Sequence, residues 1–245
     1  MNLMKPYSQS VPRCGFTLIE LLVVISIIGV LAAFVLGAIG PIRRVQHINS
    51  AKAELAYLET ALENYKAKYG FYPPCNQNGI NSYLPMDRSQ FSQLYYELSG
   101  TTNNGTYYIS PDGTQIKVAD VNTAFGTGGF INCSKGGGED VASAKNFLYG
   151  IGPKMIYNHV TNSGIATTML VTSVGGPDDN YQPLNAAKLN PFRYVCPGIN
   201  NPNSYDLWVQ LSISSSFNGV NAFTRTNKYL ICNWGDKPLK NSPQP

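Results

Sequence analysis

The sequence predicts an α+β protein in which a long N-terminal α-helix, half membrane-spanning and half amphipathic, packs on a small C-terminal antiparallel β-sheet, with a long loop-rich insertion between them. The longest apolar run of the 245 residues lies close to the N-terminus. The remainder is rich in Tyr, Asn, Gly and Ser and has few charges. This contrast is typical of an apolar membrane or filament segment that carries a polar, loop-rich head.

Residues 16–42 form the apolar run, in which Glu20 is the one ionisable side chain before Arg43 and Arg44. As a helix, this segment is roughly 40 Å long at about 1.5 Å per residue, which is enough to cross a bilayer with some tilt. A cleavable secretory signal has a shorter apolar core and a small-residue cleavage site. A lipoprotein cysteine follows its apolar stretch, whereas Cys14 precedes this one. We therefore expect a retained transmembrane helix.

Residues 43–74 are expected to form an amphipathic helix and its end. Apolar side chains recur there at alternating spacings of three and four, which is the period of one helix face. They are Ile48, Ala51, Leu55, Leu58, Leu62, Tyr65 and Tyr69. Gly70 and the Pro73–Pro74 pair then stop the helix. The stripe predicts packing on the protein's own sheet, and a self-standing coiled coil is the weaker alternative because the repeat is short.

Residues 75–245 are expected to form a globular head. In its middle part we predict short helices over 89–98 and 141–148, and a strand over 167–174 because of its β-branched residues. The segment 120–140 is predicted to be a glycine-rich loop. It lacks the GxxxxGK[ST] order of a phosphate-binding loop, so no nucleotide site is expected, and no cofactor is assigned to the chain.

The charge balance gives no reason to expect a nucleic-acid partner. The formal net charge is +4, and residues 1–15 contribute Lys5 and Arg13 without any acid. Removing these two from the 18 basic side chains leaves 16, against 14 acidic ones. The chain also has no basic run with interleaved aromatic residues. Nucleic-acid binding is therefore not expected.

The five cysteines are Cys14 near the start and Cys75, Cys133, Cys196 and Cys232, widely spaced in the head. There is no CxxC pair and there are two histidines, so a zinc site is not expected and no metal site is assigned. Disulfides made in an oxidising compartment are expected, the alternative being four buried thiols in a cytosolic protein. Four cysteines allow three pairings. We expect Cys196 with Cys232, which flank the predicted C-terminal sheet, and Cys75 with Cys133, while the other pairings stay open.

Residues 13–20, with the sequence RCGFTLIE, resemble the prepilin cleavage and N-methylation motif. A basic leader, Gly15, Phe16 and Glu20 stand in the order and spacing that type IV pilins and type II secretion pseudopilins share. The resemblance implies that a prepilin peptidase cuts between Gly15 and Phe16 on the cytoplasmic side and methylates the new Phe16 amine. Residues 1–15 are then a cleaved leader, and the apolar segment is retained.

Glu20 is expected to act in assembly. A carboxylate inside a membrane span is costly unless it has a partner, and such residues are usually functional. Once the leader is removed, the Phe16 amine is a cation, and a neighbouring subunit displaced along a filament could bring this amine to Glu20. The alternative is a glutamate that lies at the level of the lipid headgroups, near the start of the span.

The orientation in the membrane does not follow from charge alone, because Lys5 and Arg13 before the span are balanced by Arg43 and Arg44 after it. The cleavage motif and the cysteines of the head decide the matter. They place the N-terminus in the cytoplasm, the helix in the inner membrane as a single pass, and the head in the periplasm or outside the cell.

Three segments near the end of the chain, 192–196, 206–212 and 229–232, are predicted to be successive short strands. Their order is similar to the C-terminal sheet of the major (G-type) pseudopilin of type II secretion, with its NPY-like, YDLWS-like and I-NW elements. Major pseudopilins commonly carry an acidic calcium loop after the second of these elements. Residues 210–234 contain no Asp or Glu, so the usual calcium site is not expected.

These resemblances imply a structural subunit of a type IV pilus-like filament, most like a type II secretion pseudopilin that assembles through its N-terminal helix to support protein secretion. The alternative is a pilin for adhesion, motility or DNA uptake. The implied partners are further copies of the chain, the prepilin peptidase, an assembly platform with minor pilins, and the inner membrane. A membrane-anchored enzyme is less favoured, because neither His47 nor His159 lies in a nucleophile motif, and no catalytic residue is assigned.

Overall fold

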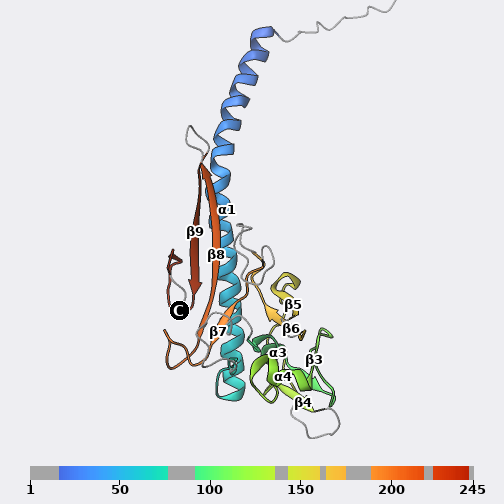
Figure 1. The fold of residues 1–245 in the computed structure, drawn as a ribbon. Coiled ribbons are helices and arrows are strands. Elements are labelled where there is room, and N and C mark those ends of the chain that lie inside the picture. The colour runs from blue at the N-terminus through green and yellow to red at the C-terminus, as the bar shows by residue number, and fades with distance from the viewer. Residues whose placement is uncertain are drawn as a thin grey trace, which may run out of the picture. The chain divides into compact units, whose positions relative to one another are not determined.

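The computed structural model describes residues 17–76, 92–135, 143–160, 164–174, 189–217 and 223–242, and at 35–41, 135, 214–217 and 223–226 it describes the backbone alone. The chain divides into two compact units, Met1–Arg43 and Arg44–Pro245, with the boundary inside helix α1 (Leu18–Tyr69). The further elements, in chain order, are α3 (Leu94–Ser99), β1 (Thr101–Asn103), β2 (Tyr107–Ile109), β3 (Gln115–Lys117), α4 (Val118–Phe125), β4 (Cys133–Lys135), the 3-10 turn η1 (Pro153–Met155), β5 (Ile156–Val160), β6 (Ala166–Leu170), β7 (Arg193–Val195), β8 (Asp206–Phe217), β9 (Phe223–Cys232) and β10 (Leu239–Lys240) (Figure 1).

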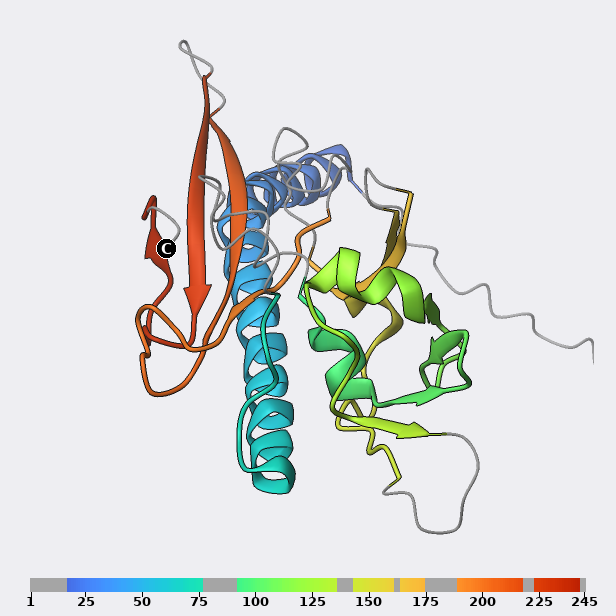
Figure 2. The ribbon, with the colours of Figure 1, turned by 60° about the horizontal axis from the view of Figure 1, so that its bottom comes forward.

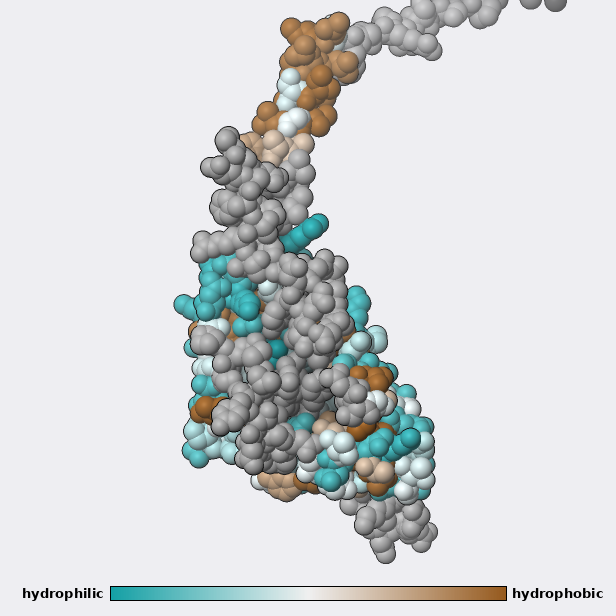
Figure 3. Space-filling view, viewed as in Figure 1, coloured by the Kyte–Doolittle hydropathy of each residue, from teal (hydrophilic) through white to brown (hydrophobic). Residues whose placement is uncertain are grey.

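The first unit, described from Thr17 onward, is the start of α1. Every large apolar side chain described there is exposed, from Leu18 at 82% to Phe34 at 74%. Figure 3 shows this part of the helix as a brown, hydrophobic surface. Apolar residues occupy all of its faces, which is typical of a helix that is covered by lipid or by other helices. In the part of the chain that the structure describes, no helix combines the length and the apolar character needed to cross a membrane.

The second half of α1 is amphipathic, as its spacing predicts. The stripe residues Leu58, Leu62 and Tyr65 are fully buried, and they share one hydrophobic core with the inward-facing side chains of the C-terminal sheet. The prediction that the stripe packs on the protein's own sheet is therefore confirmed. The helix ends at Tyr69, where Gly70 takes a positive φ of 84° and its N–H donates to the carbonyl oxygen of Lys66 at 2.7 Å. Only glycine adopts this left-handed cap without strain.

The C-terminal sheet has the strand order β10-β9-β8-β7 and is antiparallel throughout. Its centre is the long hairpin of β8 and β9, which pairs from Trp208 with Cys232 to Phe217 with Phe223. Alternate residues of β8 point into the core; they are Leu207, Val209, Leu211 and Ile213. Figures 1 and 2 both show β8 running beside the second half of α1. The three predicted strands are confirmed, and β8 and β9 extend beyond their predicted ends.

The insertion between α1 and this sheet contains two smaller sheets. One has the order β3-β2-β1-β4, in which β1 pairs parallel with β4 and the other pairs are antiparallel. The other is the antiparallel pair of β5 and β6. The strand predicted over 167–174 is confirmed in shorter form as β6, after which Val171 makes an isolated bridge to Pro191.

Three predictions for the insertion need correction. The helix predicted over 89–98 is confirmed only in shorter form as α3, because Ser92 and Gln93 precede the helix, and residues 89–91 lie outside the described part. The helix predicted over 141–148 is wrong for the described residues 143–148, where the Phe147 N–H donates to the carbonyl of Leu98 at 2.7 Å instead of to a helical partner. The loop predicted over 120–140 is partly wrong, because α4 and β4 occupy much of its described part.

A buried carboxylate joins the insertion to α1. Glu97 on α3 accepts hydrogen bonds from the Tyr65 hydroxyl at 2.9 Å and from the backbone N–H groups of Ile131 and Asn132 at 2.9 and 3.0 Å. The Asn132 side-chain amide donates in turn to the carbonyl oxygens of Glu97 and Lys145. Hydrogen bonds between buried groups specify one arrangement, because any group left without its partner is costly. The network therefore fixes α3 against the end of α1.

Candidate functional site

The first turn of α1 holds the assembly residue that the sequence predicts. The Glu20 carboxylate oxygen Oε2 accepts hydrogen bonds from both the backbone N–H and the hydroxyl of Thr17, each at 2.8 Å. The Glu20 N–H donates back to the Thr17 hydroxyl at 3.3 Å. This reciprocal arrangement is a capping box, which satisfies backbone N–H groups that have no partner inside the helix. It holds the carboxylate at the N-terminal end of the helix, where the helix dipole favours a negative charge.

Thr17 is a capping residue that the sequence analysis missed. Its signal was present, since Thr17 and Glu20 stand in the T-x-x-E spacing of a capping box just before an apolar run. Both bonds from Thr17 end on Oε2, so Thr17 does not use the second carboxylate oxygen, Oε1. Gly15 and Phe16, the predicted cleavage and methylation residues, lie outside the described residues. The contact of Glu20 with an amine of another subunit therefore stays a prediction.

The four cysteines of the head are in the thiol form. The Cys75 thiol donates a hydrogen bond to the carbonyl oxygen of Cys196 at 3.0 Å, although 121 positions separate the two residues. Cys133 lies on β4, and its thiol contacts the carbonyl of the next residue, Ser134. Cys232 ends β9 and is buried, and this burial raises the pKa of its thiol. The contact between Cys75 and Cys196 thus differs from the pairs that we predicted from the sequence.

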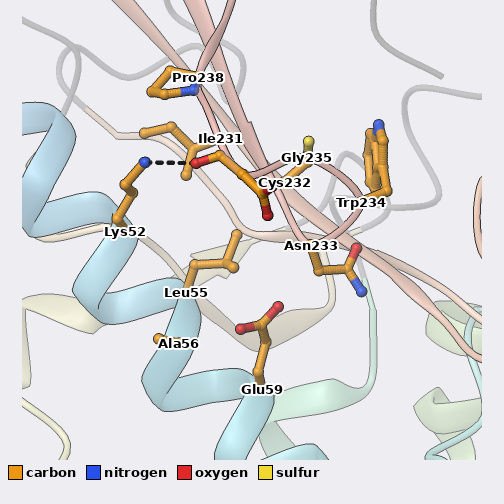
Figure 4. Close-up of a pocket in the computed structure, with 11 residues that line it drawn as sticks. Lys52, Leu55, Ala56, Glu59, Ile231, Cys232, Asn233, Trp234, Gly235 and Pro238 are labelled. Atoms are coloured by element: carbon orange, nitrogen blue, oxygen red, sulfur yellow. Dashed lines mark hydrogen bonds between the residues drawn. The ribbon is translucent and has the colours of Figure 1, made fainter.

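Cys232 also lines a pocket of about 460 Å³ in the second unit. The α1 residues Lys52, Leu55, Ala56 and Glu59 form one side, and residues 231–236 with Pro238 form the other (Figure 4). The Lys52 ammonium closes one end by donating to the carbonyl oxygen of Asp236 at 3.0 Å. Burial raises the pKa of Glu59, with a further upward effect from nearby Glu63.

The pocket does not contain the two histidines that the enzyme alternative would use, His47 and His159. His159 lies on β5, with its ring 6.4 Å from that of Tyr157, and burial lowers its pKa. Cys232 is the one thiol in the lining, and a raised pKa makes a cysteine a poorer nucleophile. The described residues of the pocket therefore show no nucleophile paired with a base.

Asp206 is a second residue whose role the sequence analysis did not identify. It is almost fully buried at the start of β8, and its carboxylate accepts hydrogen bonds from the backbone N–H groups of Ile199, Asn200 and Asn201 at 2.8 to 3.0 Å. The Asn200 side chain adds a further bond at 3.1 Å. Asp206 thus shapes the turn between β7 and β8. In the described part of the chain, no three His, Cys, Asp or Glu side chains are placed to hold a metal ion.

Comparison with known proteins finds similarity at the N-terminus and to one secretion protein. The family described as the prokaryotic N-terminal methylation motif matches residues 12–36. The type II secretion system core protein G of Escherichia coli (strain K12) is 41% identical over 68 residues, which are 28% of this chain and 46% of that protein. The chain thus matches about half the length of this relative. No solved structure matches the chain. The methylation motif and the likeness to a secretion core protein together support a relationship of the chain to type IV pilins and type II secretion pseudopilins.

Proposed function

We propose that this chain is a structural subunit of a type II secretion pseudopilus, a helical filament that grows through contacts between N-terminal helices. The observation that carries the proposal is the exposed apolar surface of α1 from Leu18 to Phe34. An apolar surface of this extent is normally covered by a partner or by lipid. Stored subunits would bury it in the inner membrane, and assembled subunits would bury it against copies of the same helix.

Processing at the N-terminus prepares the helix for both environments. In this proposal, residues 1–15 are the leader, a prepilin peptidase cuts between Gly15 and Phe16 on the cytoplasmic side, and the Phe16 amine is methylated. Residues 16–42 then anchor the chain in the inner membrane with the head in the periplasm. The match of the methylation motif to residues 12–36 supports the processing and the anchoring of the helix.

The capping box gives the proposed contact between subunits a defined acceptor. Thr17 holds the Glu20 carboxylate through Oε2 and leaves Oε1 for another donor. We propose that this donor is the Phe16 ammonium of a neighbouring subunit displaced along the filament. A charge pair inside an apolar core is much stronger than the same pair in water, because the surroundings screen it less. Each subunit offers one carboxylate and one amine, so the contact is heterologous and can repeat from subunit to subunit, as a helical filament requires.

A pilin for adhesion, motility or DNA uptake is a second candidate. The observation that favours it is the insertion, which forms two sheets of its own between α1 and the C-terminal sheet. In both proposals, the chain acts with an assembly platform and minor pilins. The likeness to a core secretion protein favours the pseudopilus.

The test combines filament recovery with two physiological readouts in the source organism. Cells that overproduce the chain together with the assembly machinery are sheared, and the sheared fraction is examined by electron microscopy and mass spectrometry. The proposal expects filaments made of this chain, and a deletion strain that retains secreted proteins in the periplasm. Normal secretion together with a loss of motility or DNA uptake would favour the second candidate. A chain that stays in the membrane while the machinery assembles other subunits would contradict both.

A further inference from the structure

We infer that Cys75 and Cys196 form a disulfide that ties the segment following α1 to strand β7. These two cysteines are brought together by the fold, although 121 positions separate them in sequence. The Cys75 sulfur lies 3.0 Å from the carbonyl oxygen of Cys196. A disulfide requires two sulfurs about 2.05 Å apart with their Cβ atoms close together. Because the Cys75 thiol already touches the backbone of Cys196, we expect side-chain rotation, without rearrangement of the sheet, to bring the sulfurs together.

A second contact holds the two segments in place beside the cysteines. Tyr194 on β7 is fully buried, and its hydroxyl donates to the carbonyl oxygen of Pro73 at 2.7 Å. The same hydroxyl lies within hydrogen-bonding reach of the Cys196 thiol. Tyr205 packs against the rings of both Tyr72 and Tyr194, with ring centroids 4.7 and 5.8 Å apart. The chain leading to Cys75 is thus anchored to the strand that ends before Cys196.

The thiols are placed for an exchange reaction. Both cysteines are half-buried, so a small disulfide or the active site of an oxidising protein can reach them. Burial raises the pKa of the Cys196 thiol, which disfavours Cys196 as the first nucleophile. The Cys75 thiolate attacks one sulfur of the oxidant's disulfide and releases the other as a thiol. The Cys196 thiolate then attacks the Cys75 sulfur of this mixed disulfide and releases the second thiol. The two cysteines lose two electrons and two protons, and the oxidant's disulfide is reduced to two thiols.

The bond would change the topology of the head. Its closed loop contains the whole insertion, from α3 to β6, so the unfolded chain would be restricted over most of the head. Closing a loop of this length is expected to raise the melting temperature by roughly 5 to 15 °C. In cells, the inference rests on the proposed function for its oxidising compartment, because disulfides persist outside the cytoplasm.

The test uses the full chain, purified in detergent under reducing conditions and then incubated with oxidised glutathione. The positions of Lys and Arg place Cys75, Cys133, Cys196 and Cys232 in four separate tryptic peptides. Mass spectrometry of the digest without reductant therefore gives the connectivity directly. We expect peptide 69–88 linked to peptide 194–225. A digest in which Cys75 is joined to Cys133 or Cys232, or in which the two expected peptides stay unlinked, would overturn the inference.

Two variants and a measurement in cells complete the test. Cys133→Ser should leave the linked peptide unchanged, whereas Cys196→Ser should leave Cys75 as a mixed disulfide with glutathione. Loss of the link in Cys133→Ser would contradict the pairing. The same mapping on cells whose thiols are blocked at lysis should also find the link. A chain that links with glutathione but is fully reduced in cells would count against export, and so against the proposed function, while the pairing itself would stand.

Discussion

The backbone N–H and the hydroxyl of Thr17 donate to the same carboxylate oxygen of Glu20, each at 2.8 Å. These two hydrogen bonds orient the Glu20 carboxylate, which has only apolar neighbours along most of the first part of the helix. It also separates two roles that the sequence motif combines. Thr17 positions the carboxylate, and in the proposed filament Glu20 would supply the charge for contact with another subunit.

Thr17→Ala should lower the yield of sheared filaments without abolishing it. The substitution removes the hydroxyl of the capping box, and the loss of such a cap typically costs about 1 kcal/mol. The carboxylate would keep its charge and lose part of its orientation. Thr17→Ser keeps the hydroxyl and should restore the yield. Equal yields from wild type and Thr17→Ala, measured with leader cleavage intact, would show that the capping box has no part in assembly.

The mature chain should begin at Phe16 and carry a methyl group on its amine. This follows from the Gly15–Phe16 junction and from the match of the methylation motif to residues 12–36. Mass spectrometry of the intact chain and of its N-terminal peptide, purified from filaments or membranes, shows both the first residue and its modification. Assembled material that retains residues 1–15 would rule out cleavage at this junction. An unmodified Phe16 would contradict the methylation alone.

The core contact between α1 and the C-terminal sheet should carry much of the stability of the head. Leu58 is fully buried in this core, so Leu58→Ala removes contacts and leaves a cavity. The free energy of unfolding should fall by about 2 to 5 kcal/mol. Asn64→Ala on the exposed face of the same helix is the control and should change it by less than about 0.5 kcal/mol. Urea titration of the full chain in detergent, followed by tryptophan fluorescence, gives both values. Similar losses from the two variants would contradict this packing.

The buried Glu97 should make the stability of the head depend on pH. Burial raises the pKa of Glu97 above its ordinary value, outweighing the opposite effect of the hydrogen bonds from Asn132, Ile131 and Tyr65. A carboxyl whose pKa is higher in the folded state binds its proton more tightly there. Its contribution to stability is therefore fully present below the unfolded pKa of about 4.3 and is lost as the pH rises through the folded pKa.

The comparison of wild type with Glu97→Gln measures this effect. As the pH rises from about 4.3, the wild type should lose free energy of unfolding relative to the variant, by at most about 1.4 kcal/mol per pH unit. Urea titrations at several pH values give the difference, and Glu63→Gln, which changes an exposed carboxylate on α1, controls for net charge. If the free energy of unfolding of the wild type instead rises relative to that of Glu97→Gln as the pH rises, the three hydrogen bonds have a larger effect on the pKa of Glu97 than burial has.

The long periodic segments could be predicted from the sequence because their information is local. Leu55, Leu58 and Leu62 repeat at helical spacing, and Gly70 supplies the conformation that ends the helix, so both the face and the end of α1 were predictable. Strands β8 and β9 were predicted shorter than they are. The extra pairs, such as Ser215 with Arg225, depend on partners across the hairpin that no local pattern announces.

The errors in the insertion have a tertiary origin. Residues 143–148 were predicted to be helical, but the Phe147 N–H bonds to Leu98, a partner that is distant in sequence. The contact of Cys75 with Cys196 was equally unpredictable, because spacing carries no information on which strands meet. At the N-terminus, by contrast, the T-x-x-E spacing of Thr17 and Glu20 is local information from which the capping box could have been predicted.

We propose that α1 assembles the filament through the Glu20 charge, and the yield of sheared filaments from Glu20→Ala decides whether it does. Membrane-bound precursor and leader cleavage are followed in the same cells, with Ser26→Ala as a matched loss of a polar group from the same helix. Removing one member of a buried charge pair typically costs about 3 to 5 kcal/mol. Glu20→Ala should therefore insert and be cleaved but yield no filaments, Glu20→Gln should fail similarly, and Ser26→Ala should assemble normally. A normal filament yield from Glu20→Ala would contradict the claim, and a loss of cleavage would move the role of Glu20 to recognition by the peptidase.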